Sequence, residues 1–426
     1  MEKVTCCNIK DGIRLYHIPS DKFKTVSMSV NIHRTLDKRE AAYNALLCDV
    51  MRRGCEKYPT QRDVARLRQS LYGAFVDVDI RRKGEDQIIS FQLSTVADCY
   101  LPETEKVQMR ALGFLFDMML EPLVEDGAFR ADYVAQEKVN LKNDIDALIN
   151  DKRAYAVWRL VELMCADEPY GVHELGTKED VDSITPQSLY AHYQKVLSEG
   201  PIDIFVVGQV DIDSIRDYIS ERFAAVSVLK TAMPKTKLHT PAKEEQEIVE
   251  AFDVTQAKLC LGFYTGVKPE DSDYPALMVY NGILGSGAHS KLFNNVREKL
   301  SLAYYASSRL ERYKGMLVIS SGIEIANKQK ALDEIKVQME EMEKGNISEY
   351  EFDAATKSIV NALRSLGDDV GYLEDYYLGQ AVSGTSVSLE EMINLINKVT
   401  PADVVRVAKK IQPELVYFLT GKGETA

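Results

Sequence analysis

The chain has 426 residues and a formal net charge of −13, with 27% of its residues charged. This length exceeds what a single hydrophobic core usually organises, so two domains are expected. The acidic balance argues against nucleic acid and against a membrane surface as partners, because both carry negative charge. The sequence has neither the apolar segment of a signal peptide nor a run approaching the roughly 18 apolar residues of a membrane span. Seven cysteines without C-x-x-C spacing indicate reduced thiols, and a cytoplasmic protein is therefore expected.

The first half of the chain predicts strands followed by long helices. Alternating apolar residues predict strands at residues 12–18, 26–32, 74–80 and 88–93. The last two of these strands are expected to form a hairpin. Apolar residues at helical spacing predict helices at 37–53, 102–120 and 131–150. This order favours an α+β fold, in which a mostly antiparallel sheet carries helices packed on one face.

A phrase near the end of the first half recurs near the end of the chain. Thr185-Pro186 opens an expected helix that leads into the apolar run 202–208, and Thr400-Pro401 opens one that leads into 415–421. Threonine caps a helix N-terminus, and proline is favoured at the first helical position. The recurrence predicts two homologous domains. They are expected at 1–227 and 247–426, joined by a linker at 228–246 that is rich in Lys, Thr and Pro.

The second half is expected to repeat the pattern of the first. Its predicted strands, the last two forming a hairpin, are 257–264, 303–310 and 315–323. Two helices split by a glycine loop are expected between the first strand and the hairpin. Further helices are predicted at 328–344 and 348–366.

Residues 284–305, the glycine loop and the helix after it, first suggest a binding site. Gly285 and Gly287 open an amphipathic helix that carries Arg297, and Tyr304 begins the next strand seven residues later. Arginine offers a fixed fork of donors to carbonyl or carboxylate oxygens, and tyrosine offers an apolar ring with one O–H donor. The pair can contact one extended ligand, but a core helix with a surface arginine explains the same pattern. The loop is equally explained as the end of one helix and the start of the next.

The same stretch resembles the C-terminal half of the insulinase/pitrilysin-type zinc peptidases. The matching positions are Ser290, Leu292, Phe293, Val296, Arg297, Glu298, Lys299, Ala303 and Tyr304. The resemblance implies two domains that form a clam-like chamber, in which Arg297 and Tyr304 bind substrate and stabilise the tetrahedral intermediate. It adds Gly285, Gly287 and His289 as candidate substrate-binding residues. A glycine-rich loop at this place monitors substrates in the non-catalytic subunit of the mitochondrial processing peptidase.

The zinc-binding half of that family's site is missing. The family carries H-x-x-E-H on its first long helix, where two histidines bind zinc and the glutamate activates the bound water. In this chain Ala45 and Asp49 stand in place of the histidines, and Cys48 stands in place of the glutamate. The helix of the third ligand is matched by Glu137 and Asp144. No two histidines lie three to five residues apart, so no metal or other cofactor is expected here, and zinc is expected on a partner chain.

This combination resembles the non-catalytic subunits of two-chain members of the family, in which one chain brings the zinc motif and the other brings arginine and tyrosine. The chain is therefore interpreted as a substrate-binding subunit without catalytic residues of its own. The expected partners are a zinc-bearing homologue in a heterodimer, or a second copy in a homodimer, and a peptide or protein substrate. Two alternatives stay open: a stand-alone peptide-binding or scaffold protein, and a peptidase with an unrecognised site. Residues 71–74 and 315–324 are similar to insulinase-like proteins associated with 5-aminopentanol modification of elongation factor P.

Overall fold

The computed structural model describes residues 4–102, 104–226 and 235–422. Contacts between residues group the chain into two compact units. Unit 1 contains the described residues of Met1–Asp146, Val172–Lys235 and Gly367–Val382, and unit 2 contains those of Ala147–Gly171, Thr236–Leu366 and Ser383–Ala426. Each unit therefore takes one segment from the half of the chain that otherwise builds the other unit. Part of the predicted linker lies outside the described residues, and its last residue, Gln246, already begins a strand.

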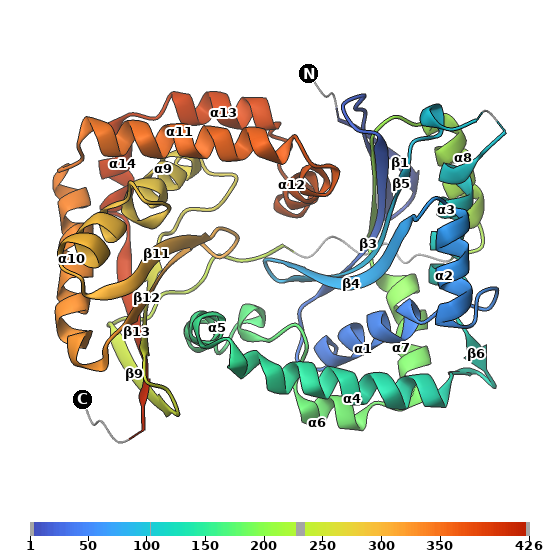
Figure 1. The fold of residues 1–426 in the computed structure, drawn as a ribbon, viewed down its shortest axis with the longest axis horizontal. Helices are drawn as coiled ribbons and strands as arrows, with labels where there is room; N and C mark the ends of the chain where they lie inside the picture. The colour runs from blue at the N-terminus through green and yellow to red at the C-terminus, as the bar shows by residue number, and fades with distance from the viewer. Residues whose placement is uncertain (1–3, 103, 227–234, 423–426) are drawn as a thin grey trace. The chain divides into compact units, whose positions relative to one another are not determined.

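The sheet of unit 1 has six strands in the order β1-β2-β8-β3-β5-β4 (Figure 1). They are β1 (Thr5–Lys10), β2 (Ile13–Ile18), β3 (Thr25–Thr35), β4 (Phe75–Lys83), β5 (Asp86–Val96) and β8 (Ile202–Val207). The pair β2 and β8 is parallel, and the other neighbours are antiparallel. The predicted strands and the predicted hairpin of this half are therefore confirmed.

Helices and one face of this sheet enclose the core of unit 1. The helices are α1 (Ala41–Arg52), α2 (Gln61–Ser70), α3 (Val107–Leu120), α4 (Ala131–Ala147), α6 (Lys178–Ser183), α7 (Pro186–Glu199) and α8 (Ile212–Arg222). A short pair, β6 (Val124–Glu125) and β7 (Ala128–Phe129), lies between α3 and α4 in the chain. Val26, Met28, Val30 and Ile32 of β3 belong to the core, as their alternation along the strand predicts.

The sheet of unit 2 has five strands in the order β11-β12-β10-β13-β9. They are β9 (Gln246–Phe252), β10 (Ala257–Tyr264), β11 (Ala303–Glu311), β12 (Met316–Ile323) and β13 (Gln412–Gly421). The pair β13 and β9 is parallel, and the other neighbours are antiparallel. This order reproduces β4-β5-β3-β8-β2 of unit 1, with the parallel pair at the same place. The shared order supports the predicted internal duplication.

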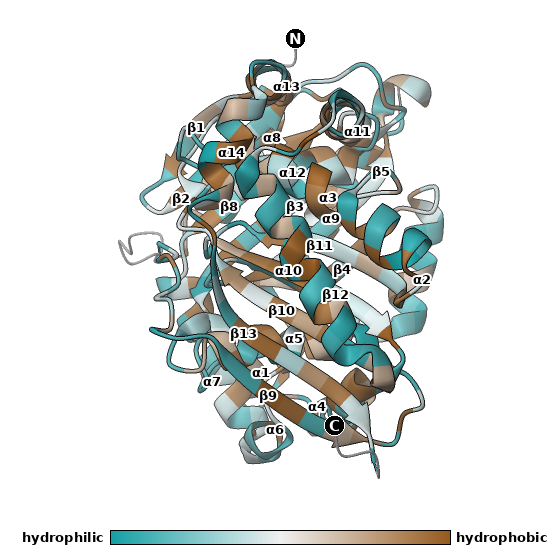
Figure 2. Cartoon of the chain, turned by 90° about the vertical axis from the view of Figure 1, so that its left-hand side faces the viewer, coloured by the Kyte–Doolittle hydropathy of each residue, from teal (hydrophilic) through white to brown (hydrophobic). Residues whose placement is uncertain are grey.

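Most helices of unit 2 come from the second half of the chain, from α9 onward. They are α9 (Tyr274–Gly285), the π-helix η4 (Leu292–Lys299), α10 (Lys328–Lys344), α11 (Glu349–Leu366), α13 (Leu389–Asn397) and α14 (Pro401–Ala408). Figure 2 shows hydrophobic residues along β10 and β13, and many hydrophilic residues along α10. The repeated phrase is confirmed, because Thr185 and Thr400 both cap a helix that has proline in its first turn. None of the described helices is long and apolar enough to cross a bilayer.

One further helix covers the second face of each sheet, and neither helix was predicted from the sequence. In unit 1 this helix is α12 (Val370–Ser383), whose Glu374 accepts a hydrogen bond of 2.7 Å from Ser29 of β3. In unit 2 it is α5 (Lys152–Met164), which packs so closely on β10 that a Cβ added to Gly262 would lie 2.2 Å from Met164 Sδ. Each sheet thus has helices on both faces rather than on the one face expected. Periodicity shows which side of a helix is apolar, but it does not show which surface that side meets.

The second face of the unit 1 sheet carries a buried polar network. His33 of β3 lies with Nδ1 3.0 Å from Asp86 and with Nε2 3.2 Å from Asp203. Arg14 donates two hydrogen bonds of 2.8 Å to Asp203. Burial alone would lower the pKa of His33, but its hydrogen bonds to Asp203 and Asp86 outweigh burial and raise that pKa to about 9. His33 is therefore a buried cation at neutral pH.

We expect the free energy of unfolding to decrease as pH rises from about 6.5, the ordinary pKa of histidine, to about 9. The folded chain holds the His33 proton more tightly than the unfolded chain, so this stabilisation is complete below pH 6.5 and lost above pH 9. The decrease should reach at most about 3 kcal/mol. Urea unfolding between pH 6 and pH 9.5 measures it, and His33→Gln should flatten the profile. A variant profile as steep as that of the wild type would contradict the assignment.

Candidate functional site

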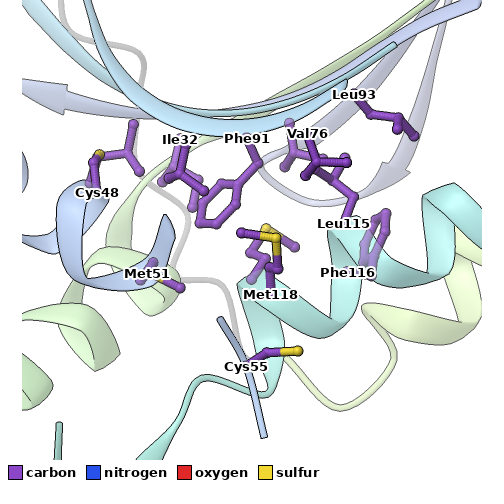
Figure 3. Packing of buried hydrophobic residues seen from close by; sticks show 14 of the residues in the cluster. Ile32, Cys48, Met51, Cys55, Val76, Phe91, Leu93, Leu115, Phe116 and Met118 are labelled. Carbon is purple, nitrogen blue, oxygen red and sulfur yellow. The ribbon is translucent and has the colours of Figure 1, made fainter. Parts of the chain in front are cut away.

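Two of the positions matched to the zinc motif are core residues of α1. Ala45 is 4% exposed and Cys48 is 1% exposed. Figure 3 shows Cys48 in a cluster of apolar side chains that includes Ile32 and Phe91 of the sheet. Burial raises the pKa of the Cys48 thiol well above its ordinary value, so this thiol stays protonated. Ala45 has no ligand atom, and Cys48 is a neutral core residue.

The third position of the motif, Asp49, faces an arginine. Arg52 Nη1 lies 3.7 Å from Asp49, and Arg52 Nε lies 2.8 Å from Asp77. Burial raises the pKa of Asp49 to about 7; Arg52 opposes this shift, and the carboxylates of Glu137 and Asp144 add to it. The guanidinium of Arg52 thus places positive charge next to the carboxylates of Asp49 and Asp77.

Helix α4, which matches the helix of the family's third zinc ligand, also binds an arginine. Glu137 is 8% exposed and accepts a hydrogen bond of 2.6 Å from Arg53. Asn140 donates to the other carboxylate oxygen of Glu137 at 2.8 Å. In the described part of the chain, neither Asp49 nor Asp144 belongs to a group of three or more ligand atoms lying within 4.8 Å. These residues do not fit the family's zinc, because both histidines are absent and arginine side chains lie against the carboxylates of Asp49 and Glu137.

Arg297 lies near the C-terminal end of the π-helix η4, with 43% of its side chain exposed. Leu292 and Val296 form the buried side of this helix and leave the arginine on its surface. The guanidinium carbon lies 4.7 Å from the centre of the Phe293 ring, and Nε lies 3.5 Å from Glu298. Short π-helical segments occur frequently at functional sites. Because 43% of its side chain is exposed, Arg297 can contact a ligand, and it lies in a type of segment that is frequent at functional sites.

Tyr304 occupies a β-bulge at the start of β11. The register between β11 and β12 shifts between Ala303 and Tyr305, which leaves Tyr304 as the extra residue. Tyr304 is 56% exposed, and its hydroxyl donates to Glu324 at 3.4 Å. A bulge redirects a side chain and is common next to active sites. Neither the bulge nor the contact with Glu324 was predicted from the sequence, since the pattern of residues does not reveal a register shift.

The turn between Arg297 and Tyr304 contains a strained residue. Ser301 has a φ angle of 49°, in the left-handed region that residues other than glycine rarely adopt. The backbone nitrogen of Leu302 donates to the carbonyl of Val296 at 3.0 Å and closes the end of the π-helix. Strain of this kind costs about 1–3 kcal/mol and is found preferentially at binding and catalytic sites. This turn sets the direction in which the chain leaves η4 for the bulge.

The glycine loop serves the packing of neighbouring elements. Gly285 is the last residue of α9, and a Cβ there would lie 2.4 Å from the backbone nitrogen of Ser308 in β11. Gly287 has a φ angle of +140°, and a Cβ there would lie 3.0 Å from the ring of His289. His289 is half-buried, and its Nε2 atom has no hydrogen-bond partner among the described residues. These contacts favour the structural explanation for Gly285, and substrate contact by Gly287 and His289 stays a prediction.

Gly285→Ala is expected to lower the free energy of unfolding by about 1–3 kcal/mol, because the new methyl group would collide with the backbone of β11. Chemical denaturation measures the change. Gly113→Ala in α3 is a matched control, since its Cβ would meet no atom closer than 3.4 Å and alanine favours a helix. Unchanged stability of Gly285→Ala would argue against the packing role.

Comparisons with known proteins identify the family. Residues 183–359 match the family model described as Peptidase M16 inactive domain. Over 412 residues, the chain is 36% identical to the Probable inactive metalloprotease YmfF of Bacillus subtilis (strain 168), and the match covers 96% of each chain. The chain belongs to the M16 peptidase family. The predicted membership of the insulinase/pitrilysin-type peptidases is thereby confirmed, and within the M16 family the chain is a homologue of the inactive type.

Solved structures, one of them of an M16 peptidase domain, share the fold of the whole chain. A conserved protein from Enterococcus faecalis V583 superposes with a TM-score of 0.91 at 31% identity, covering 99% of this chain and 100% of that one. The peptidase M16 inactive domain from Pseudomonas fluorescens superposes with a TM-score of 0.82 at 16% identity, covering 99% of both chains. The Uncharacterized zinc protease YmxG of Bacillus subtilis (strain 168) is 24% identical over 71% of this chain and 73% of that one. The predicted α+β class is confirmed by this shared M16 fold.

Proposed function

We propose that this M16 homologue is a non-catalytic, substrate-binding subunit that supplies Arg297 and Tyr304 to the zinc site of a partner chain. The contrast between the two halves of the family's site carries the proposal. At the zinc positions, Ala45 and Cys48 are buried core residues. By contrast, 43% of the Arg297 side chain is exposed, and Tyr304 is 56% exposed.

The chemistry of the two exposed side chains suits a developing oxyanion. A zinc-activated water on the partner would attack the peptide carbonyl and place negative charge on its oxygen. Arg297 offers N–H donors that stay charged at every accessible pH, and Tyr304 offers one O–H donor. The bulge at Tyr304 and the strained turn at Ser301 fix the backbone that carries them. Donors held in place before the reaction need no reorganisation when the charge develops.

A zinc-bearing homologue is the proposed partner. The matched relatives of this chain include the Probable inactive metalloprotease YmfF and the Uncharacterized zinc protease YmxG, both from Bacillus subtilis (strain 168). Both kinds of chain thus occur together in one organism. This co-occurrence supports a heterodimer of one zinc-bearing and one inactive chain, acting on a peptide or protein.

Reconstitution tests the proposal. The purified chain is mixed in turn with each zinc-bearing M16 homologue from its own organism, and assembly and hydrolysis of a fluorogenic peptide library are measured. We expect one mixture to form a stable complex and to hydrolyse peptides faster than either chain alone. Peptide binding without assembly would instead indicate a stand-alone peptide-binding protein. Hydrolysis by the isolated chain would indicate a peptidase with another site.

A further inference from the structure

A separate cluster of metal-ligating side chains lies in unit 2. Cys165, Glu168 and His239 bring a thiol, a carboxylate and an imidazole together, with ligand atoms that all lie within 4.8 Å of one another. Cys165 Sγ lies 3.7 Å from His239 Nδ1, and Glu168 Oε1 lies 2.8 Å from the same nitrogen. Donor atoms around a tetrahedral zinc ion are separated by about 3.3–3.6 Å. The separation of Cys165 Sγ from His239 Nδ1 is already close to this range, and the carboxylate of Glu168 would move away from Nδ1 by about half an ångström to admit a metal ion.

The fold positions these three residues through backbone hydrogen bonds. Cys165 follows the last residue of α5, and the turn closes when Glu168 N donates to Cys165 O at 2.9 Å. The backbone nitrogen of His239 donates to the carbonyl of Lys314 at 2.9 Å, and Thr240 N donates to Glu168 Oε1 at 3.0 Å. Cys165 is 0% exposed and His239 is 3% exposed. The thiol and the imidazole are thus held in a buried, preformed position.

Two further side chains support the ligands through the atoms that a metal would not use. Glu414 Oε1 lies 2.6 Å from His239 Nε2, which leaves Nδ1 directed at Cys165 and Glu168. Lys314 Nζ lies 2.5 Å from Glu168 Oε2, which leaves Oε1 directed at His239. A carboxylate on the second nitrogen of a ligating histidine, and a donor on a ligating carboxylate, are the usual supports of a metal centre.

We propose that Cys165, Glu168 and His239 form a zinc site with three protein ligands. Thiolate, imidazole and carboxylate are the three ligand types that zinc accepts together. Binding of Zn²⁺ would release the thiol proton and the proton between His239 and Glu168, so the net charge of the cluster would not change. The ion would tie the end of α5 to the segment before β9. This proposal does not depend on the proposed function, and its ligands are not those of the M16 zinc motif.

Metal binding to the full chain tests the site. The protein is stripped with a chelator, dialysed and titrated with Zn²⁺ against a chromophoric competitor, and Co²⁺ serves as a spectroscopic probe. We expect one equivalent of zinc per chain, and Co²⁺ should show a thiolate charge-transfer band with the visible bands of tetrahedral cobalt. Zinc at 100-fold excess over its Kd should raise Tm by about 5–10 °C. No zinc binding, or a Co²⁺ spectrum without the thiolate band, would overturn the proposal.

Variants locate the bound ion. Cys165→Ser and His239→Gln are each expected to lose the equivalent of zinc. Cys260→Ser should retain it, because Cys260 is an equally buried thiol of unit 2 that lies 3.7 Å from Ser320. Asp49→Asn should also retain it, which separates this site from the positions on α1. Retention of zinc by a folded His239→Gln variant would overturn the proposal, and the Co²⁺ spectrum of the wild type decides the question if that variant does not fold.

Discussion

Replacing Arg297 with alanine is expected to lower kcat of the assembled peptidase about 10²–10³-fold. This is the usual effect of removing one hydrogen-bond donor from a site that stabilises an oxyanion. The guanidinium is proposed to act on charge that develops during the reaction, so kcat should change more than KM. Assembly should not change, because the side chain is 43% exposed and Leu292 and Val296 provide the buried contacts of its helix. Steady-state kinetics of the reconstituted complex, with its mass measured by light scattering, checks both expectations.

Arg364→Ala is the matched control for Arg297. Arg364 is an exposed arginine of α11 in the same unit, and its loss removes the same charge from a different place. It should leave kcat unchanged. Tyr304→Phe removes one O–H donor and should lower kcat in the same direction as Arg297→Ala. Equal kcat values for the wild type and Arg297→Ala would contradict the proposed role of Arg297 in the partner's active site, even if the two chains assemble.

Leu160→Ala in α5 is expected to lower the free energy of unfolding of unit 2 by about 2–5 kcal/mol. Leu160 is 0% exposed and packs with residues of β10, β12 and β13 in one apolar cluster. Truncation would remove buried methyl groups and leave a cavity that the rigid sheet cannot fill. Urea unfolding followed by tryptophan fluorescence measures the loss, since Trp158, the only tryptophan of the chain, lies in the same helix.

Leu395→Ala provides the comparison for Leu160. Leu395 lies on α13 of the same unit and is 40% exposed, so its truncation should change stability by no more than about 0.5 kcal/mol. Equal, small effects of the two substitutions would contradict the packing of α5 on the unit 2 sheet. A large effect of Leu160→Ala alone would show that this segment, which precedes residue 172 in the chain, stabilises the unit built mainly from the second half.

The loss of the zinc motif could be predicted from sequence because the ability to bind a metal is a property of residue types. Alanine at position 45 has no ligand atom in any fold, and no pair of histidines has the spacing that one helix turn requires. The repeat was equally visible, since Thr185 and Thr400 cap their helices through local hydrogen bonds. Local interactions of this kind depend on neighbours in the chain.

The cluster around His239 could not be predicted in the same way. His239 lies in the predicted linker 228–246, and Cys165 is one of the seven cysteines interpreted as reduced thiols. In the structure, Cys165 and Glu168 meet His239, Lys314 and Glu414 from distant parts of the chain. Residues separated by 74 or 175 positions share no spacing that a local pattern can detect.

The sequence by itself determined the strands, most of the helices, the duplication and the absence of the zinc ligands, because each depends on residue type or on spacing within one element. The tertiary structure decided that α12 lies on β3 through Glu374 and that α5 lies on β10 at Gly262, on the second faces of the two sheets. It also placed Tyr304 on a bulge and placed Arg53 on Glu137. Each of these depends on which surfaces meet after the chain has folded, and many different pairings satisfy the same apolar and polar pattern.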